Sequence, residues 1–553
     1  MQSDPQLRTT VVCLTAILAA AAFTYWAAGA PERFGFYHDD ALYVVTAKSL
    51  ATGQGYRILS LPYEPAETKY PPLYPFFLSL IWRASPIFPE NIPRLMALSA
   101  VAMLAFVSLV WLYLVERRYA AGWVALTAVA AAALNWRTVV LATATLSEAL
   151  YAALSVGVLW LAEAKAGTRP GRFHSIVLGI GMGLLVLTRT SGIALLVAVV
   201  VWHLIRRQTS RWLLSFGVAS ALVLAWGLWV HANRTDSENF TAAYYTSYWR
   251  DWSDSLKSAG SAENGNVAAF FSLVGNQAFR LIAVSLPVAC LGLDYRWHDG
   301  TDSTLVAMGL LLVLATTVML VVGFVKQCKP SVRLLHLYVL CYLGLHLVWP
   351  YTAHDRFLMP LLPFLIVFLL GAMTSAPLLV RKGAARPSNL SSLARSAAFG
   401  LLVCGIVGFA FWQHASGLRR VLGPARHSHS AQASEDDEIA RWIREHTGAS
   451  DVLIGYRDPD YYLRTGRRMV RSSFVMQGAG SKGRAQILFR LIRENRARYL
   501  VRRSGDFDQD AQPEAQRDSL AAILNEYPEN FLPVFQTSSG RGVVYRISAP
   551  SPG

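Results

Sequence analysis

The sequence predicts a polytopic α-helical membrane protein that ends in a small α/β domain, and three observations support this prediction. Hydrophobic residues make up 54% of the 553 residues and charged residues only 16%, against roughly 25% charged in an average soluble domain. The apolar residues gather into blocks close to the roughly 20 residues that a helix needs to cross a bilayer. From residue 434 onwards the composition becomes that of an ordinary soluble domain. We therefore expect about eleven transmembrane helices followed by one aqueous domain.

The apolar blocks define the predicted helices. In chain order they occupy residues 11–30, 93–115, 121–136, 139–162, 175–189, 191–205, 212–231, 303–325, 334–350, 357–380 and 396–415. The first block is interpreted as a retained helix, because its N-terminal flank is weakly basic and no clear cleavage pattern precedes Pro31; a cleaved signal peptide is the alternative. A further apolar segment, 270–293, contains Arg280 and Pro287 and would invert every later loop if it crossed. We expect it to re-enter the membrane or to lie on its surface.

Topology, rather than a nucleic-acid partner, explains the formal net charge of +16. The excess Lys and Arg lies mostly in short loops between apolar blocks, and with a cytoplasmic N-terminus these loops all face inward, as the positive-inside rule requires. Residues 31–92 carry five Lys/Arg and six Asp/Glu, and residues 232–266 carry three and five. We expect these loops and the C-terminal domain on the outer, periplasmic or extracellular, side of a cytoplasmic membrane. The arginine- and alanine-rich composition suits a bacterium.

The predicted domains are a transmembrane region, 1–415, a linker rich in Ser, Ala and His, 416–433, and an α/β domain, 434–553. Within the last, helical periodicity marks 437–446 and 486–496, and strand-like runs mark 451–456, 498–502 and 542–547. Its 18 Lys/Arg nearly balance its 16 Asp/Glu, so its net charge indicates no anionic partner. All five cysteines precede this domain, which argues against a disulfide framework or a cysteine metal site in it.

The first outer loop, 31–92, holds the densest group of polar residues beside membrane-embedding sequence. Asp39 and Asp40 are adjacent, and two carboxylates near lipid are costly unless they face water, a cation or a substrate. Their mutual repulsion can raise the pKa of one of them into the range useful for a general base. The alternative is that one of them caps a helix over 41–51, and taken alone this explanation is the stronger.

Six short motifs follow one another along the chain. They are Asp39-Asp40-Ala41-Leu42-Tyr43, Gly53-Gln54-Gly55, Lys69-Tyr70-Pro71-Pro72-Leu73-Tyr74, Ser147-Glu148-Ala149-Leu150-Tyr151, Leu187-Thr188-Arg189 and Arg356-Phe357-Leu358-Met359-Pro360-Leu361-Leu362-Pro363. Together they resemble the GT-C class glycosyltransferases, and within that class the protein O-mannosyltransferase and aminoarabinose transferase superfamily. The first outer loop of that superfamily carries Asp-Glu-x-x-Tyr followed by Lys-Pro-Pro-Leu-Tyr. Each motif is short, so their joint order is the specific signal.

The resemblance implies a role for each matching residue. An acidic residue of the first outer loop is the family's general base, which puts Asp39 in that role and Asp40 where Glu is usual. Lys69 stands at the position of the Lys before Pro-Pro and is the expected phosphate contact, although Tyr70 intervenes here. Tyr43 matches the tyrosine of the first motif and is expected to support the substrate or a metal. A polyprenyl-phosphate donor needs a base for the acceptor hydroxyl and cations for the departing phosphate.

Three charged residues adjoin or lie within apolar blocks. Arg356 could hold the same phosphate through its planar guanidinium, but an interfacial arginine that reaches toward lipid headgroups is an equal alternative, and Arg189 is ambiguous in the same way. Glu148 lies within an apolar stretch, where a lone carboxylate is expensive. Its partner could be a divalent metal shared with Asp39, an arginine or the acceptor, and the competing account is a structural Glu–Arg pair.

An aromatic cluster lies in the second outer loop. Its members are Tyr244, Tyr245, Tyr248, Trp249 and Trp252. Such rings usually anchor a protein at the membrane interface, and sugar stacking is a secondary possibility.

The main hypothesis is an integral membrane glycosyltransferase that moves a hexosyl or pentosyl group from a polyprenyl-phosphate carrier to an outer-face acceptor, with inversion. The acceptor could be a glycan, a lipid or a protein. A divalent metal is possible but not required, membrane lipids are partners and nucleic acid is not. No glycine-rich nucleotide loop is present, which disfavours a nucleotide-sugar donor. The alternatives are a secondary transporter, whose polar residues usually lie near the bilayer midplane in repeated halves, and a non-catalytic membrane scaffold.

Overall fold

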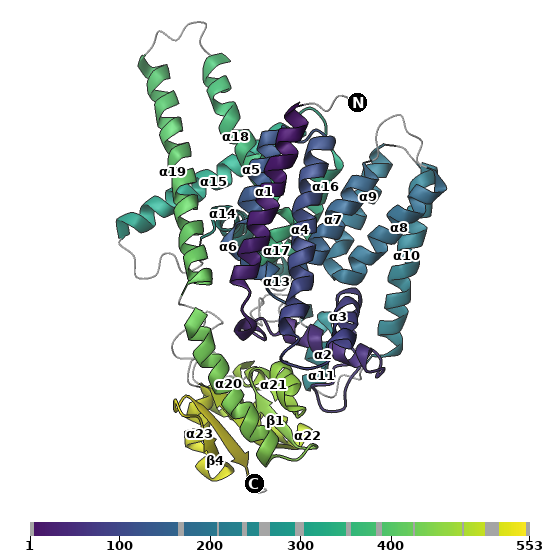
Figure 1. Cartoon of the computed structure of the whole chain (residues 1–553), viewed down its shortest axis with the longest axis vertical. Coiled ribbons are helices and arrows are strands. Elements are labelled where there is room, and N and C mark those ends of the chain that lie inside the picture. Colours follow the sequence, from purple (N-terminus) through teal and green to yellow (C-terminus); the bar gives the residue numbers. More distant parts are fainter. Residues whose placement is uncertain are drawn as a thin grey trace. The chain divides into compact units, whose positions relative to one another are not determined.

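The computed structural model consists mainly of helices, with one small sheet (Figure 1). It describes residues 5–163, 171–206, 209–234, 240–250, 252–253, 266–293, 303–349, 355–382, 390–423, 426–477, 480–503 and 519–548. The chain forms two compact units. Unit 1 comprises Met1–Gly29, Met96–Leu228 and Asp251–Gly423, and unit 2 comprises Ala30–Leu95, Trp229–Arg250 and Pro424–Gly553. The first outer loop and the C-terminal domain thus belong to the same unit.

Unit 1 is helical. Its helices are α1 (Pro5–Ala28), α4 (Ile92–Glu116), α5 (Gly122–Ala133), α6 (Trp136–Ala142), α7 (Glu148–Ala162), α8 (Arg172–Thr188), α9 (Ile193–Ile205), α10 (Thr209–Ala232), α13 (Asn266–Phe279), α14 (Leu286–Leu291), α15 (Ser303–Cys328), α16 (Leu334–Leu347), α17 (Asp355–Leu358), α18 (Leu362–Lys382) and α19 (Leu390–Leu422). Glycine lets some of them approach closely: a Cβ on Gly183 of α8 would lie 2.5 Å from the Leu222 side chain of α10. Small residues at such contacts are typical of packed membrane helices.

Seven helical stretches of the described chain are long and apolar enough to cross a membrane. They are Arg8–Ala28, Ile92–Glu116, Leu213–Ala232, Phe270–Leu291, Val306–Cys328, Arg356–Thr374 and Ala397–Leu422. Helices α5 and α6, bent by 65°, make an eighth if they form one span, and four further apolar helices are shorter. The prediction of a polytopic helical protein is confirmed. The count of about eleven spans is not confirmed, because five predicted spans (121–136, 139–162, 175–189, 191–205 and 334–350) correspond to helices shorter than the roughly 20 residues of a full crossing.

The chain breaks where the sequence predicted one helix over 139–162. Helix α6 ends at Ala142 and α7 begins at Glu148. Glu148 therefore lies in the first turn of a helix instead of inside a long span. The partial positive charge at a helix N-terminus favours a carboxylate at this position, which lowers the cost that the sequence implied.

The segment 270–293 is one helical run. Helix α13 continues through a π-helical turn at Arg280–Ser285 into α14. Pro287 lies just after this turn, and because proline lacks an N–H, a π turn accommodates the gap it leaves in the hydrogen-bond ladder. Its 22 residues Phe270–Leu291 are also long and apolar enough to cross a membrane. The prediction that this segment re-enters the membrane or lies on its surface therefore stays a prediction, and topology experiments must distinguish it from a crossing helix.

Unit 2 contains a five-stranded sheet in the order β2-β1-β3-β5-β4. The strands are β1 (Val452–Gly455), β2 (Arg468–Arg471), β3 (Ala497–Arg503), β4 (Phe531–Gln536) and β5 (Gly542–Ile547). Strand β1 pairs in parallel with β2 and β3, and β5 pairs antiparallel with β3 and β4. The three predicted strands are confirmed, whereas β2 and β4 were not predicted.

Helices cover both faces of this sheet. They are α20 (Arg426–His446), α21 (Asp458–Thr465), α22 (Gly480–Asn495) and α23 (Ser519–Glu526). Alternate residues of β1 point to opposite faces: Leu453 is buried with Ile443 of α20, and Ile454 is buried with Leu488 of α22. The two helices predicted in this domain are confirmed. Much of the predicted linker is helical, since α19 extends to Leu422 and α20 begins at Arg426.

The first outer loop packs onto the C-terminal domain within unit 2. The loop forms helices α2 (Asp39–Ala51) and α3 (Leu73–Ala84), and the second outer loop contributes α11 (Phe240–Thr246). Leu42, Ile58 and Leu61 belong to the same buried cluster as Ile454. An even number of membrane crossings must therefore separate the loop from the C-terminal domain.

Candidate functional site

Asp39 is the first residue of α2 and is held by a tyrosine. The preceding residue, His38, has a positive φ of 60° and ends the turn that leads into the helix. The Tyr70 hydroxyl donates a hydrogen bond of 2.8 Å to Asp39 Oδ1. Asp39 is half-buried, so its carboxylate is both oriented by the protein and partly open. Such a group can accept a proton from a bound hydroxyl.

Tyr70 is fixed in turn by its neighbours. Its backbone carbonyl accepts a hydrogen bond of 2.9 Å from the Tyr56 hydroxyl. Its ring packs edge to face against Tyr43, which packs in the same way against Tyr74. Tyr43, the residue expected to support the substrate or a metal, is buried at 3% exposure. Its observed contacts support Tyr70, and through Tyr70 they support Asp39.

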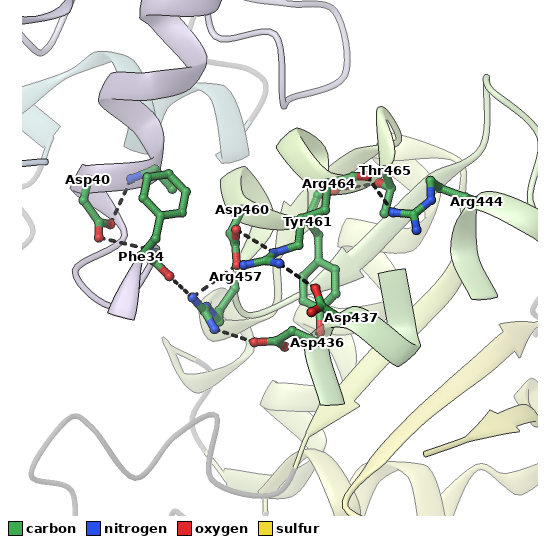
Figure 2. Close-up of polar contacts among 12 residues, drawn as sticks. Phe34, Asp40, Asp436, Asp437, Arg444, Arg457, Asp460, Tyr461, Arg464 and Thr465 are labelled. Carbon is green, nitrogen blue, oxygen red and sulfur yellow. Dashed lines mark hydrogen bonds and ion pairs between the residues drawn. The ribbon is translucent and has the colours of Figure 1, made fainter. Parts of the chain in front are cut away.

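Asp40 faces the protein interior. It is 1% exposed, and its two oxygens accept hydrogen bonds from the Gly35 and Ala41 backbone N–H groups at 2.9 and 2.8 Å (Figure 2). Burial raises the pKa of Asp40 to about 7, and nearby Arg457 opposes this rise. Asp40 thus closes the turn in front of α2, a role close to the capping alternative.

Lys69 lies among aromatic rings. It is 5% exposed, and its Nζ donates a hydrogen bond of 3.1 Å to the Tyr244 carbonyl. The ring centroids of Tyr244 and Tyr248 lie 4.7 and 5.3 Å from this ammonium, within cation–π range. The second outer loop was expected to anchor the protein at the membrane interface, but these two tyrosines instead surround Lys69. Trp249, at 72% exposure, could still serve as an anchor.

Glu67 is a second buried carboxyl that sequence reasoning missed. Its Oε1 accepts hydrogen bonds from the backbone N–H groups of Lys69 and Tyr70 at 2.7 and 2.9 Å. Its Oε2 has no hydrogen-bond partner among the described residues. Burial raises the pKa of Glu67 to about 7. Glu67 therefore shapes the backbone that presents Tyr70 to Asp39.

Unit 1 holds an independent charged cluster around Glu148. Arg189 Nη1 lies 2.9 Å from Glu148 Oε1, and the Arg356 Nε bonds to the same oxygen. Arg189 also donates to the Ser147 hydroxyl at 2.9 Å. Both guanidinium groups lie about 6 Å from the Phe357 ring centroid. The arginine partner, one of the options for Glu148, is therefore the one observed, and the three side chains carry a formal charge of +1.

His346 of α16 adjoins this cluster and was also missed by sequence reasoning. It is 4% exposed, and neither ring nitrogen has a hydrogen-bond partner among the described residues. Its ring centroid lies 5.6 Å from that of Phe357 and 4.9 Å from that of Tyr342. A histidine in an apolar helix gives no periodic signal, so only the fold reveals this position.

The surroundings of Glu148 disfavour a metal, although its Oε2 has no hydrogen-bond partner among the described residues. Glu148 Oε1 already bonds to two guanidinium groups, and a divalent cation beside them would be repelled. Among the described residues, no group of three or more His, Cys, Asp and Glu side chains could hold a metal ion. The predicted metal site of Asp39 and Glu148 thus gains no support from the Glu148 cluster.

No protein-family model matches the sequence, and no curated protein matches it. Solved structures are similar in fold. The Archaeoglobus fulgidus oligosaccharyltransferase tethered to an acceptor peptide has 13% identity and a TM-score of 0.54, over 97% of this chain and 74% of that one. ArnT from Cupriavidus metallidurans bound to undecaprenyl phosphate has 13% identity and a TM-score of 0.52, over 98% of this chain and 99% of that one. The chain therefore has the fold of the GT-C membrane glycosyltransferases that its motifs resemble.

Proposed function

We propose that this protein is a glycosyltransferase that moves a hexosyl or pentosyl group from a polyprenyl-phosphate donor to an acceptor at the outer face of a cytoplasmic membrane. The observation that carries the proposal is the oriented, half-buried Asp39 carboxylate at the start of α2, bonded to Tyr70. The shared fold supports it, because ArnT has been solved with undecaprenyl phosphate and the archaeal oligosaccharyltransferase with an acceptor peptide.

In the proposed reaction Asp39 is the general base. The acceptor hydroxyl loses its proton to the Asp39 carboxylate while its oxygen forms a bond to the anomeric carbon. The bond between that carbon and the phosphate oxygen breaks, and polyprenyl phosphate leaves with the electron pair. Because attack and departure occur in line without an enzyme-bound sugar, the anomeric configuration inverts. The acceptor is a glycan, a lipid or a protein.

Arg189 and Arg356 are the proposed contacts of the donor phosphate. Both guanidinium groups meet at Glu148 Oε1, so two groups suited to phosphate recognition lie side by side. A guanidinium presents several N–H groups in a plane, so each arginine can bond to Glu148 and to a phosphate at the same time. Glu148 is then the residue that fixes the direction of both arginines.

Lys69 and Asp40 take secondary roles in this proposal. An ammonium has three donors, so the bond from Lys69 to the Tyr244 carbonyl is compatible with an additional phosphate contact. Asp40 is buried against backbone N–H groups and maintains the turn in front of α2 rather than exchanging a proton with substrate.

The test is donor turnover by purified protein. Synthetic polyprenyl-phosphate hexoses and pentoses are supplied with membrane extract as a mixed acceptor source, and release of polyprenyl phosphate is measured. We expect release from one donor class. NMR of the product should show that the anomeric configuration of the transferred sugar is inverted relative to the donor. The same protein in proteoliposomes provides the control for a transporter. Uptake of solute without release of polyprenyl phosphate from any donor would refute the proposal.

A further inference from the structure

The C-terminal domain contacts the residues immediately before Asp39. At the end of β1 the chain turns into α21 through Arg457 and Asp458. An Arg457 N–H group donates to the Phe34 carbonyl (Figure 2). Asp458 Oδ1 lies 3.0 Å from the His38 Nε2. Both ends of the turn over 34–38 are therefore held from the C-terminal domain.

Arg457 is itself fixed by buried carboxylates. Its guanidinium bonds to Asp436 of α20 at 2.6 Å and to Asp460 of α21 at 3.1 Å (Figure 2). Asp436 also accepts hydrogen bonds from the Tyr461 hydroxyl, at 2.7 Å, and from Arg503 of β3. The hydrogen bond to Phe34 thus originates in a network of the α20, α21 and β3 side chains and not in a mobile surface side chain.

Asp458 is fixed in a similar way. Its Oδ2 accepts a hydrogen bond of 2.7 Å from the Tyr245 hydroxyl, and Tyr245 is 1% exposed in the same buried cluster as Ile454. The His38 ring packs beside Tyr245, with centroids 5.7 Å apart. The contact between His38 Nε2 and Asp458 Oδ1 therefore lies one residue before Asp39.

The turn leaves no room for a side chain at Gly35. Its φ is +79°, and a Cβ there would lie 2.6 Å from an Arg457 nitrogen. The Gly35 N–H also donates to Asp40 Oδ2 at 2.9 Å, which closes the turn. The path of residues 34–40 is therefore fixed jointly by glycine, by Asp40 and by Arg457.

We infer that Arg457 and Asp458 are positioning residues for Asp39, so that the C-terminal domain is a working part of the transferase and not an appended module. This inference rests on the proposed function, because it assigns Asp39 the role of base. Neither residue exchanges a proton with substrate. Their effect is to hold the turn over 34–38, and hence the start of α2, in one orientation.

Arg457→Lys tests this inference, with Arg503→Lys as the matched control. Arg503 bonds to the same Asp436 and is similarly buried, so its replacement disturbs the carboxylate network but keeps the bond to Phe34. We expect Arg457→Lys to lower kcat about 10- to 100-fold with donor KM nearly unchanged, the size of effect that a small misplacement of a catalytic group produces. Arg503→Lys should keep kcat near the wild-type value.

A second variant and a second measurement keep the test decisive if Arg457→Lys folds poorly. Tyr245→Phe retains the ring but removes the hydrogen bond to Asp458, and it should also lower kcat. Hydrogen exchange at the amides of residues 35–42 should accelerate in both variants and not in Arg503→Lys. Combining Arg457→Lys with Asp39→Asn should produce no loss beyond that of Asp39→Asn alone, since both act on one step.

The outcomes separate the two proposals. An active Asp39→Asn variant would refute the proposed base, whatever the other variants do. An inactive Asp39→Asn variant together with wild-type kcat in folded Arg457→Lys and Tyr245→Phe would overturn the positioning inference alone. The same holds if the only change is a lower yield of folded protein, with kcat per folded molecule and amide exchange unaltered.

Discussion

The Tyr70 hydroxyl donates a 2.8 Å hydrogen bond to Asp39, and Tyr70 is the residue that separates Lys69 from the Pro-Pro step. In the sequence this insertion looks like a departure from the family motif. In the fold it supplies the group that orients the proposed base. A departure from a motif can therefore carry a compensating function that only the tertiary contact reveals.

Asp39→Asn should abolish transfer while expression and donor binding stay largely intact. The amide keeps the size of the side chain and can still accept a hydrogen bond from Tyr70, but it cannot take up the acceptor proton. Loss of a general base typically reduces the rate by roughly 100- to 10,000-fold. Turnover and donor binding are measured on the same preparation. Near-normal turnover would show that Asp39 is not the base and that another carboxylate must take this role.

Tyr70→Phe should reduce kcat about 10- to 100-fold, because a hydrogen bond to a charged group contributes roughly 1.5 to 3 kcal/mol. The ring contact with Tyr43 is retained in this variant, so the fold should survive. Tyr56→Phe is the matched control, since it removes a tyrosine hydroxyl that bonds to the Tyr70 backbone instead of to Asp39. Equal kcat values for Tyr70→Phe and wild type would show that Asp39 needs no such support.

Arg189→Ala and Arg356→Ala should each raise the apparent donor requirement and slow the reaction. A charged contact to phosphate acts in the bound donor and strengthens as the leaving group gains charge. The double variant should lose less than the sum of the single losses, because both groups act on one phosphate. Steady-state kinetics across a donor series provides the measurement. Lys69→Ala belongs in the same series, and an unchanged donor dependence would remove the substituted residue from the phosphate site.

Glu67→Gln should flatten the pH dependence of stability. Burial raises the pKa of Glu67 to about 7, whereas an unfolded glutamate titrates near pH 4.3, an approximate reference value. Between these values the folded protein binds the additional proton, so the free energy of unfolding falls as pH rises through this window. Glutamine does not titrate, so it contributes no such fall in the free energy of unfolding. Thermal midpoints at pH 5 and pH 8 should therefore differ less in the variant, and an identical difference would contradict the buried neutral carboxyl.

Reporter fusions at residues 60, 388 and 500 should place 60 and 500 on one side, outside, and 388 on the other. The packing of the first outer loop on the C-terminal domain requires 60 and 500 to share a side: the Met469 N–H, for example, donates to the Ser60 carbonyl at 2.9 Å. An added fusion between 294 and 302 reports whether Phe270–Leu291 crosses. If 60 and 500 lay on opposite sides, the outer position of the C-terminal domain would be wrong.

Sequence patterns predicted the helical class because long apolar blocks are local signals, and motif order selected Asp39, Glu148, Arg189 and Arg356 as candidate site residues. They misplaced Glu148 within a span, since the interruption of the helix at residues 143–147 contains no proline or glycine and still includes the apolar Leu146. They also missed β2 and β4. Strand β2 is four residues long with arginine at both ends, and β4 contains Pro533, so neither shows clear alternation. The contacts of Tyr70 with Asp39 and of Arg457 with Phe34 join residues distant in the chain, which no local pattern reveals.

His38 and Asp458 are 420 residues apart in the chain yet bonded in the fold. The ribosome therefore releases the Asp39 loop long before the domain that contacts it, and in the proposed outer topology the loop waits across the membrane until the C-terminal domain has been translocated. We expect a chain truncated before β1 to lack an ordered turn in front of Asp39. Under the proposed function, activity therefore begins only after the C-terminal domain has been made. Chimeras that exchange C-terminal domains should carry residues 30–95 with them.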